Sequence, residues 1–313
     1  MPLFAAVFHS PWWLIASLLL FLLLMQWFVT LLKFSPLPED RLLRLETISA
    51  SHFVEKVRWS IDRLGLPYRE TANGGTLGAF FTGRTVPKLH IPTGKVISTI
   101  GNSSDILRYL WGRYGNTPEY ESKAKFLEPT PEATALEEQL DGYGVDLQRW
   151  FYANGLSHRK LMMRVWGLQD PFVPFFQRCA LWLLYPILCP LVGNAFHIRA
   201  KTGANSATRI AAFLGKMEKR LEDGRTYVLG GAELTYIDIA LAALSGIWVF
   251  PTQYGNGRAE HVLPKDSLLP PRMRQDIADW KTAFPKVYAH ILNLYQNDRM
   301  TSRTPNEVRP NRP

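Results

Sequence analysis

A serine stands where its hydroxyl could hold an anion at the start of a helix. Residues 51–59 (SerHisPheValGluLysValArgTrp) open a helical pattern that Gly65 ends, with apolar residues at Phe53, Val57, Ile61 and Leu64. A hydroxyl at a helix N-terminus can donate to a thiolate, and the positive end of the helix dipole favours that anion. Two alternatives stay open, since Ser51 could simply cap the helix and Ser49 could be the cap or the donor.

A second polar helix start follows at residues 102–110, AsnSerSerAspIleLeuArgTyrLeu. The hydroxyl and amide of Ser103 would lie at a helix N-terminus, which is a site that binds a carboxylate. Asn102 can accept or donate hydrogen bonds there, but it brings no negative charge. The alternative is that Ser103 or Ser104 only caps the helix.

Between these helices, ThrValPro at 85–87 precedes a hairpin signal in which 85–91 and 95–100 flank Pro92-Thr93-Gly94. Proline suits the first residues of a strand because it cannot donate to the ladder. Pro87 could therefore be an ordinary edge-strand proline. Its spacing of 36 residues from Ser51, ahead of a hairpin, favours a more specific role.

The elements that would position these residues form two sets. Strands are expected at 41–48 and from 68–70, a helix at 53–65, a loop at 73–78, the hairpin, and a helix from 103. After Tyr114 the pattern predicts helices at 132–156, 206–221, 236–249 and 276–295. We therefore expect an α/β domain followed by an all-helical domain.

The longest ordered motif lies in the part of the chain that is expected to be helical. TyrValLeuGlyGly at 227–231 is followed by ThrTyrIleAsp at 235–238. A threonine with an acid three residues later is a capping box, which satisfies two free amides at the start of a helix. Its expected role is structural.

Over residues 41–297 these motifs together resemble the cytosolic glutathione S-transferase superfamily. The resemblance implies a thioredoxin-like domain at 41–114, a helical domain at 120–297 and glutathione as co-substrate without a metal. It implies a cis Pro87, a catalytic Ser51, and glutathione contacts from Val86, Pro87, Asn102 and Ser103. The chain departs from the family pattern at His52, where proline is usual, and at Asn102, where glutamate is usual. Dimerisation is common in the family.

In that family the second substrate lies against the first long helix of the helical domain. Here this helix offers Tyr143, Arg149, Trp150 and Tyr152. Arg149 could hold an acidic substrate or a leaving group. The alternative is a helix with aromatic core residues and one solvated arginine.

An apolar segment precedes the domains. Residues 12–32 contain no formal charge, and at about 1.5 Å per residue they extend about 30 Å, the thickness of a bilayer core. No Lys or Arg precedes Lys33, so a retained anchor (1–33) is favoured over a signal peptide. Lys33, Arg41 and Arg44 follow the span, which predicts a single-pass protein with its main domain in the cytosol. Residues 34–40 would be a stiff linker, and 298–313 a disordered tail.

Residues 172–196 form another strongly apolar stretch, interrupted by Arg178 and by prolines. The uninterrupted part, 180–187, is too short to span a bilayer. It could be a buried helix pair, or an interfacial patch helped by the nearby basic residues His158, Arg159, Lys160 and Arg164. The stretch contains both cysteines, Cys179 and Cys189, which are expected to be reduced and buried.

Composition excludes several classes of protein. The 313 residues are 47% hydrophobic and 20% charged, which excludes a mostly disordered chain. Two cysteines exclude a disulfide scaffold, and they lack zinc-site spacing. A net charge of +9 would suit nucleic acid, but no interleaved aromatic and basic motif supports that partner. The functions that remain are a membrane-anchored transferase acting on an apolar electrophile, another glutathione chemistry, and a non-catalytic scaffold.

Overall fold

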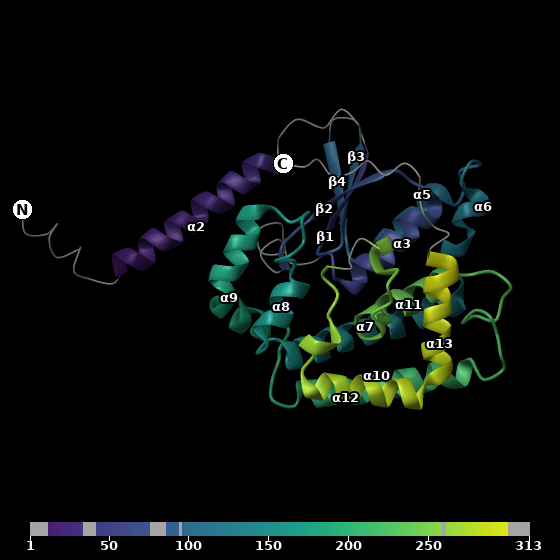
Figure 1. The fold of residues 1–313 in the computed structure, drawn as a ribbon. Helices are drawn as coiled ribbons and strands as arrows, with labels where there is room; N and C mark the ends of the chain where they lie inside the picture. The colour runs from purple at the N-terminus through teal and green to yellow at the C-terminus, as the bar shows by residue number, and fades with distance from the viewer. Residues whose placement is uncertain (1–11, 34–41, 76–85, 94–95, 258–260, 300–313) are drawn as a thin grey trace, which may run out of the picture.

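The computed structural model describes residues 12–33, 42–75, 86–93, 96–257 and 261–299 (Figure 1). Its first part contains β1 (Leu43–Thr47), α3 (His52–Leu64), β2 (Tyr68–Ala72), β3 (Lys88–Thr93), β4 (Val96–Gly101) and α5 (Ser103–Tyr114). The expected linker at 34–40, half of the loop at 73–78 and most of the tail at 298–313 lie outside the described residues.

The four strands form one mixed sheet in the order β2-β1-β3-β4. Strand β1 pairs parallel with β2 and antiparallel with β3, and β3 pairs antiparallel with β4. Leu45 of β1 faces Leu89 of β3 in the register, and both are fully buried. A β-α-β unit followed by a β-hairpin and a helix is the topology that the resemblance implies for a thioredoxin-like domain.

Helix α3 lies between this sheet and the helical part of the chain, where it contacts α11 (Tyr236–Val249) (Figure 1). It ends where Gly65 adopts the left-handed conformation, with φ 71°, as its sequence predicts. Nearly all its residues are buried, including charged ones that find partners. Lys56, for example, binds Glu137 at 3.1 Å and Ser104 at 2.9 Å, which joins α3 to the helices on both sides.

The second part of the chain is helical. It contains α6 (Glu121–Ala124), η1 (Lys125–Leu127), α7 (Pro131–Gly155), α8 (Arg159–Val165), α9 (Phe175–Ala195), α10 (Thr202–Arg220) and α11, followed by η2 (Tyr254–Gly257) and η3 (Asp266–Leu268). Every residue of α11 is buried. The expected capping box begins this helix, with the Asp238 carboxylate accepting from the amides of Thr235 (2.9 Å) and Val228 (2.7 Å).

Two helix predictions differ from the structure. The single helix expected over 276–295 is instead α12 (Pro271–Ala283) and α13 (Pro285–Asn293), because Pro285 has no amide hydrogen to continue the first helix and suits the start of the next. The apolar stretch at 172–196 forms one helix, α9, that continues through Pro186 and Pro190, and not a helix pair.

The last described residues, 294–299, are helical. Residues Leu294–Arg299 form a π-helical segment, η4, although 298–299 were assigned to the tail. Arg299 is fully buried, and its guanidinium donates to Glu55 (2.9 Å) and Asp62 (2.8 Å) of α3. The last described residue is therefore bound to α3, the first helix of the sheet domain.

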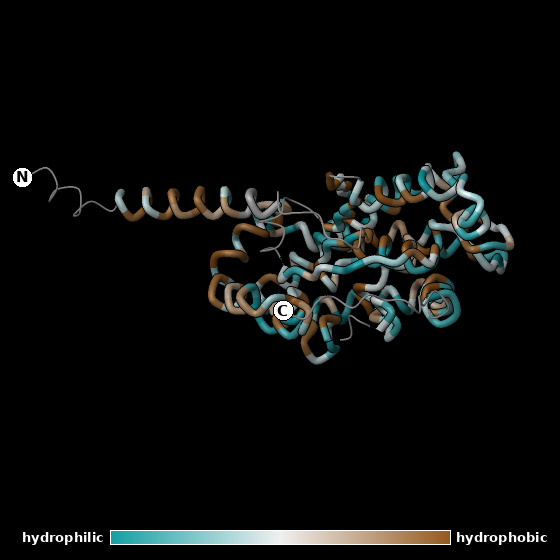
Figure 2. Tube along the Cα trace, turned by 90° about the horizontal axis from the view of Figure 1, so that it is seen from above, coloured by the Kyte–Doolittle hydropathy of each residue, from teal (hydrophilic) through white to brown (hydrophobic). Residues whose placement is uncertain are grey.

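The expected N-terminal segment is helical, as α2 (Trp12–Lys33). Its described side chains are almost all exposed, and Figure 2 shows it as an apolar rod. Among the described helices, α9 alone is both long and apolar enough to cross a membrane, while the described side chains of α2, Trp12–Phe28, form a shorter apolar stretch. A membrane role for α2 stays a prediction.

Candidate functional site

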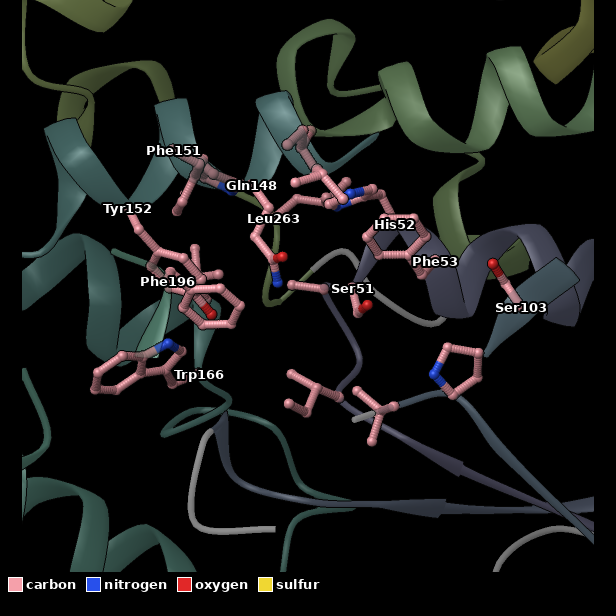
Figure 3. Close-up of a pocket in the computed structure, with 18 of the residues that line it drawn as sticks. Ser51, His52, Phe53, Ser103, Gln148, Phe151, Tyr152, Trp166, Phe196 and Leu263 are labelled. Atoms are coloured by element: carbon pink, nitrogen blue, oxygen red, sulfur yellow. The ribbon is translucent and has the colours of Figure 1, made fainter. Parts of the chain in front are cut away.

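A cavity of about 360 Å³ lies where the sheet domain meets the helices. Its walls come from β1–α3, the segment before β3, the start of α5, one face of α7, and the ends of α8 and α9. Figure 3 shows aromatic side chains at one end (Phe151, Tyr152, Trp166, Phe196), with Ser51, Phe53 and Ser103 toward the other. The cavity thus has an apolar end and a hydroxyl-bearing end.

Ser51 lines the cavity at the N-terminus of α3. Its side chain makes no capping hydrogen bond, so the cap-only interpretation does not hold in this structure. Ser49 is not the alternative donor, because its hydroxyl donates to Asp170 Oδ2 at 2.5 Å. The first amides of a helix have no intrahelical partner, and with the helix dipole they favour an anion beside the Ser51 hydroxyl.

Ser103 lines the same cavity at the start of α5. It is 2% exposed, and its hydroxyl is buried without a hydrogen-bond partner. Asn102 caps the helix, since its side chain accepts from the Ser104 amide at 3.2 Å. The Ser104 hydroxyl donates to Asp141 at 2.9 Å. Neither serine therefore caps α5, and Ser103 keeps a free hydroxyl where a buried polar group ordinarily has a partner.

Val86 and Pro87 form a third wall, just before β3. The peptide bond between them is cis, as the resemblance implies. Both residues border the cavity, which brings Ser51, Val86, Pro87, Asn102 and Ser103 together around one space. All five residues to which the resemblance gives a catalytic role (Ser51) or a glutathione contact therefore border one cavity.

His52, the departure from the family pattern, has a structural role here. Its Nε2 hydrogen-bonds the Gly144 carbonyl of α7 at 3.0 Å, so the ring must carry its proton on Nε2. Its ring also packs on Phe53, with 4.3 Å between the ring centroids. His52 thus joins the helix that bears Ser51 to α7, and the helix still begins beside Ser51.

Burial lowers the pKa of His52 to about 4, against the smaller opposing effect of its bond to Gly144. The unfolded chain therefore binds a proton at His52 between about pH 6.5 and 4 that the folded chain excludes. We expect the free energy of unfolding to fall across this window as pH is lowered, by up to about 3 kcal/mol from this residue. Urea titrations at several pH values measure it, and in His52→Gln this part of the slope should vanish while the bond to Gly144 survives.

Of the residues proposed to contact a second substrate (Tyr143, Arg149 and Tyr152), Tyr152 alone is among the described residues that line the cavity. Tyr152 lines the cavity and stacks on Phe196 with 5.0 Å between centroids, and burial raises its pKa, so it stays a neutral phenol. Tyr143 instead lies in the core, bonded to Ser245 (2.8 Å) and Trp248 (2.9 Å). Arg149 is not among the described residues that line the cavity.

The face of α7 that borders the cavity carries Val145, Gln148, Phe151 and Tyr152. Counting back from Tyr152 by three gives Arg149 and by four gives Gln148, so helical spacing alone does not separate them. Gln148 lies three residues from both Val145 and Phe151, which places it at the centre of the lining face. Gln148 adds an amide to the cavity wall. The contributions of Trp166, Phe196, Ile247 and Leu263 had no comparable sequence signal, because they come from the ends of separate elements.

The described part of the cavity wall contains no Asp, Glu, Lys or Arg. Helix amides, hydroxyls, Asn102 and Gln148 therefore supply its polarity. Across the described residues, no group of three or more His, Cys, Asp or Glu side chains is placed to hold a metal ion.

No protein-family model and no curated protein matches the chain. Several solved structures do. A glutathione S-transferase from Methylobacterium radiotolerans, in complex with glutathione sulfonate, is 17% identical with a TM-score of 0.46, covering 84% of this chain and 94% of that one. A glutathione transferase from Pseudomonas putida with glutathione disulfide bound is 14% identical with a TM-score of 0.44, covering 87% and 95%. Ure2p5 from Phanerochaete chrysosporium, cocrystallised with 1-(S-glutathionyl)-2,4-dinitrobenzene, is 16% identical with a TM-score of 0.44, covering 84% and 93%. Sequence identities of 14–17% and TM-scores below 0.5 carry no conclusion about the chemistry of the cavity.

Proposed function

We propose that the protein is a membrane-anchored, glutathione S-transferase-like enzyme that joins the glutathione thiol to an apolar electrophile. One observation carries the proposal. Two helix N-termini bring the hydroxyls of Ser51 and Ser103, neither of which makes a capping hydrogen bond, to one end of a cavity whose other end is aromatic. The hydroxyl end suits an anionic, peptide-like thiol, and the aromatic end suits an apolar partner.

Each residue has a distinct part in this proposal. The Ser51 hydroxyl, beside the positive end of α3, donates to the thiolate and lowers the pKa of the thiol. The Ser103 hydroxyl and amide receive the γ-glutamyl carboxylate, and the backbone of Val86 pairs with the cysteinyl unit. The thiolate sulfur then bonds to the electrophilic carbon, and the leaving group departs with its electron pair.

The apolar α2 helix supports the membrane part of the proposal. In the sequence, the uncharged run of residues 12–32 has the length that a bilayer-crossing helix needs, and Lys33 follows it. In this arrangement the enzyme body faces the cytosol, where glutathione is held reduced. A membrane-dissolved electrophile would suit the aromatic end of the cavity.

Calorimetry on the full-length protein in detergent tests the proposal, followed by conjugation of a generic aromatic electrophile. We expect glutathione to bind at millimolar concentration or below, and its S-methyl derivative to compete. Absence of binding at millimolar glutathione would contradict the proposal. It would favour a non-catalytic binding protein on this fold, for which the uncharged wall and Asn102 in place of glutamate are the supporting observations.

Ser103→Ala is expected to raise the KM for glutathione about tenfold or more, because a hydrogen bond to a charged group contributes about 1.5–3 kcal/mol. The value of kcat should change little, since Ser103 holds a part of the substrate that does not react. Steady-state kinetics at varied glutathione concentration separates the two parameters. An unchanged KM would remove Ser103 from the binding site.

A further inference from the structure

Helix α9 presents a continuous apolar stripe to the outside of the protein. From residue 175 to residue 191 its exposed positions recur at helical spacing: Phe175, Phe176, Cys179, Trp182, Leu183, Pro186, Ile187, Pro190 and Leu191. Asn194 and Ala195, at the end of the helix, are exposed as well. Phe175, Phe176 and Leu183 are each about 70% exposed. No charged residue lies in the stripe. A continuous exposed apolar surface of this kind marks an interaction site.

The opposite face of α9 is fixed to the protein. Leu181, Tyr185, Leu188 and Val192 are buried in the core. The Tyr185 hydroxyl donates to the Leu156 carbonyl at 2.7 Å, and Gln177 accepts from the Gly74 amide at 2.7 Å. To cross a bilayer, α9 would have to leave these core contacts and both hydrogen bonds, although its length would suffice. Only its outer stripe is available to a partner.

The part of the sequence that contains α9 is basic. Residues 156–202 contain six basic residues against one acid, Asp170, which is buried: Arg159, Lys160, Arg164, Arg178, Arg199 and Lys201. That excess of five is more than half of the net charge of +9. Arg159 also lies over the rings of Trp182 (5.3 Å) and Tyr185 (5.5 Å), so a cation sits directly beside the apolar stripe. Apolar residues with basic neighbours are typical of helices that lie in the headgroup layer of anionic membranes.

The same charges disfavour the other occupants. A symmetric dimer through this stripe would place one basic patch against an identical one, at a cost in repulsion. Helix α2 contains no acidic residue that could neutralise the patch. An anionic bilayer supplies both an apolar phase and the opposite charge.

We propose that α9 is a second membrane contact, which lies flat in the headgroup region of an anionic bilayer with its outer stripe in the acyl boundary. The inference does not depend on the glutathione chemistry. The contact would also place the cavity near the membrane, because Phe196, which follows the last residue of α9, lines the cavity. The aromatic end of the cavity then lies next to the lipid surface.

A spin label on Cys179 can measure how deeply α9 lies in the bilayer, since Cys179 is exposed within the stripe and the chain has only one other cysteine. The full-length Cys189→Ser variant is labelled at Cys179 and reconstituted in phosphatidylcholine vesicles with about one third phosphatidylserine. The accessibility of the label to oxygen and to a water-soluble nickel chelate reports its depth in the bilayer. We expect a label depth of about 5–10 Å, with high oxygen and low nickel accessibility. The control is Cys179→Ser/Cys189→Ser/Ala278→Cys, labelled on an exposed position of α12, which should be open to nickel.

A charge-reversal variant tests the contribution of the basic residues, and circular dichroism checks that this variant is still folded. Lys160→Glu/Arg159→Glu should raise the nickel accessibility at Cys179 several-fold in the same vesicles, while circular dichroism stays unchanged. A Cys179 label as open to nickel as the α12 control would overturn the proposal. A label shielded from both reagents would also overturn it, in favour of a protein partner, and dipolar coupling between labels would identify that partner as a second copy.

Discussion

Ser51→Ala is expected to lower kcat/KM for glutathione conjugation about ten- to a hundredfold at neutral pH. A hydrogen bond from a hydroxyl to an anion contributes about 1.5–3 kcal/mol, and about 1.4 kcal/mol corresponds to a factor of ten. Since Ser51 has no capping bond to lose, the change should act on the thiolate and leave stability nearly unaltered. The pKa of bound glutathione, followed by the ultraviolet absorbance of the thiolate, should rise by about one to two pH units.

Ser49→Ala is the matched control, because this hydroxyl lies two residues away and is already bonded to Asp170. It should leave the thiol pKa unchanged. Ser51→Thr keeps a hydroxyl and should restore part of the activity. If Ser51→Ala turns over at the rate of the unmodified enzyme, the hydroxyl does not stabilise the thiolate and the catalytic assignment of Ser51 fails.

Arg299→Ala is expected to cost about 3–5 kcal/mol of the free energy of unfolding, because it leaves two buried carboxylates without their shared cation. Glu55 and Asp62 are fully or almost fully buried, and Arg299 is bonded to both. Glu55 retains Arg58 at 2.8 Å, and Asp62 retains the hydroxyl of Tyr68 at 3.0 Å, so the loss should not exceed this range. The midpoint of urea unfolding at pH 7 measures the change.

Lys125→Ala serves as the reference, since Lys125 pairs with Glu233 in an ion pair whose side chains are 64% and 72% exposed. Such a pair is expected to contribute less than about 1 kcal/mol. Arg299→Lys should fall between the two, because it keeps the charge but not the forked geometry. A stability loss for Arg299→Ala no larger than that of Lys125→Ala would show that Arg299 is not bound to α3 in solution.

Local patterns in the sequence predicted most of the elements. The helix of residues 53–65, the β-hairpin and the capping box at Thr235 were all recognised, because each depends on neighbours within a few residues. The expectation of a cis Pro87 came from the resemblance to a family, and the structure has that bond. The helix break at Pro285 is also a local feature, because the proline itself ends one helix and begins the next.

Contacts between residues far apart in the chain could not be predicted from the sequence. The residues around Arg299 give no indication that it binds Glu55, 244 residues earlier. The polar, proline-rich composition of residues 297–313 predicts a disordered tail. The two apolar helices α9 and α11 look alike in composition, yet α11 is enclosed on every side and α9 on one. Cys179, expected to be buried, is exposed for the same reason.

In the candidate site, too, some features were determined by the local sequence and others by the tertiary structure. Residue types and spacing in the sequence alone determined that hydroxyls stand at two helix starts and that Pro87 opens a strand, since a turn of helix or a strand entrance is set by its own residues. Tertiary structure decided which hydroxyls stay free: Ser49 is taken by Asp170, Ser104 by Asp141, and Ser103 is left without a partner. Hydrogen-bond partners are supplied by packing between elements, and packing depends on the whole chain.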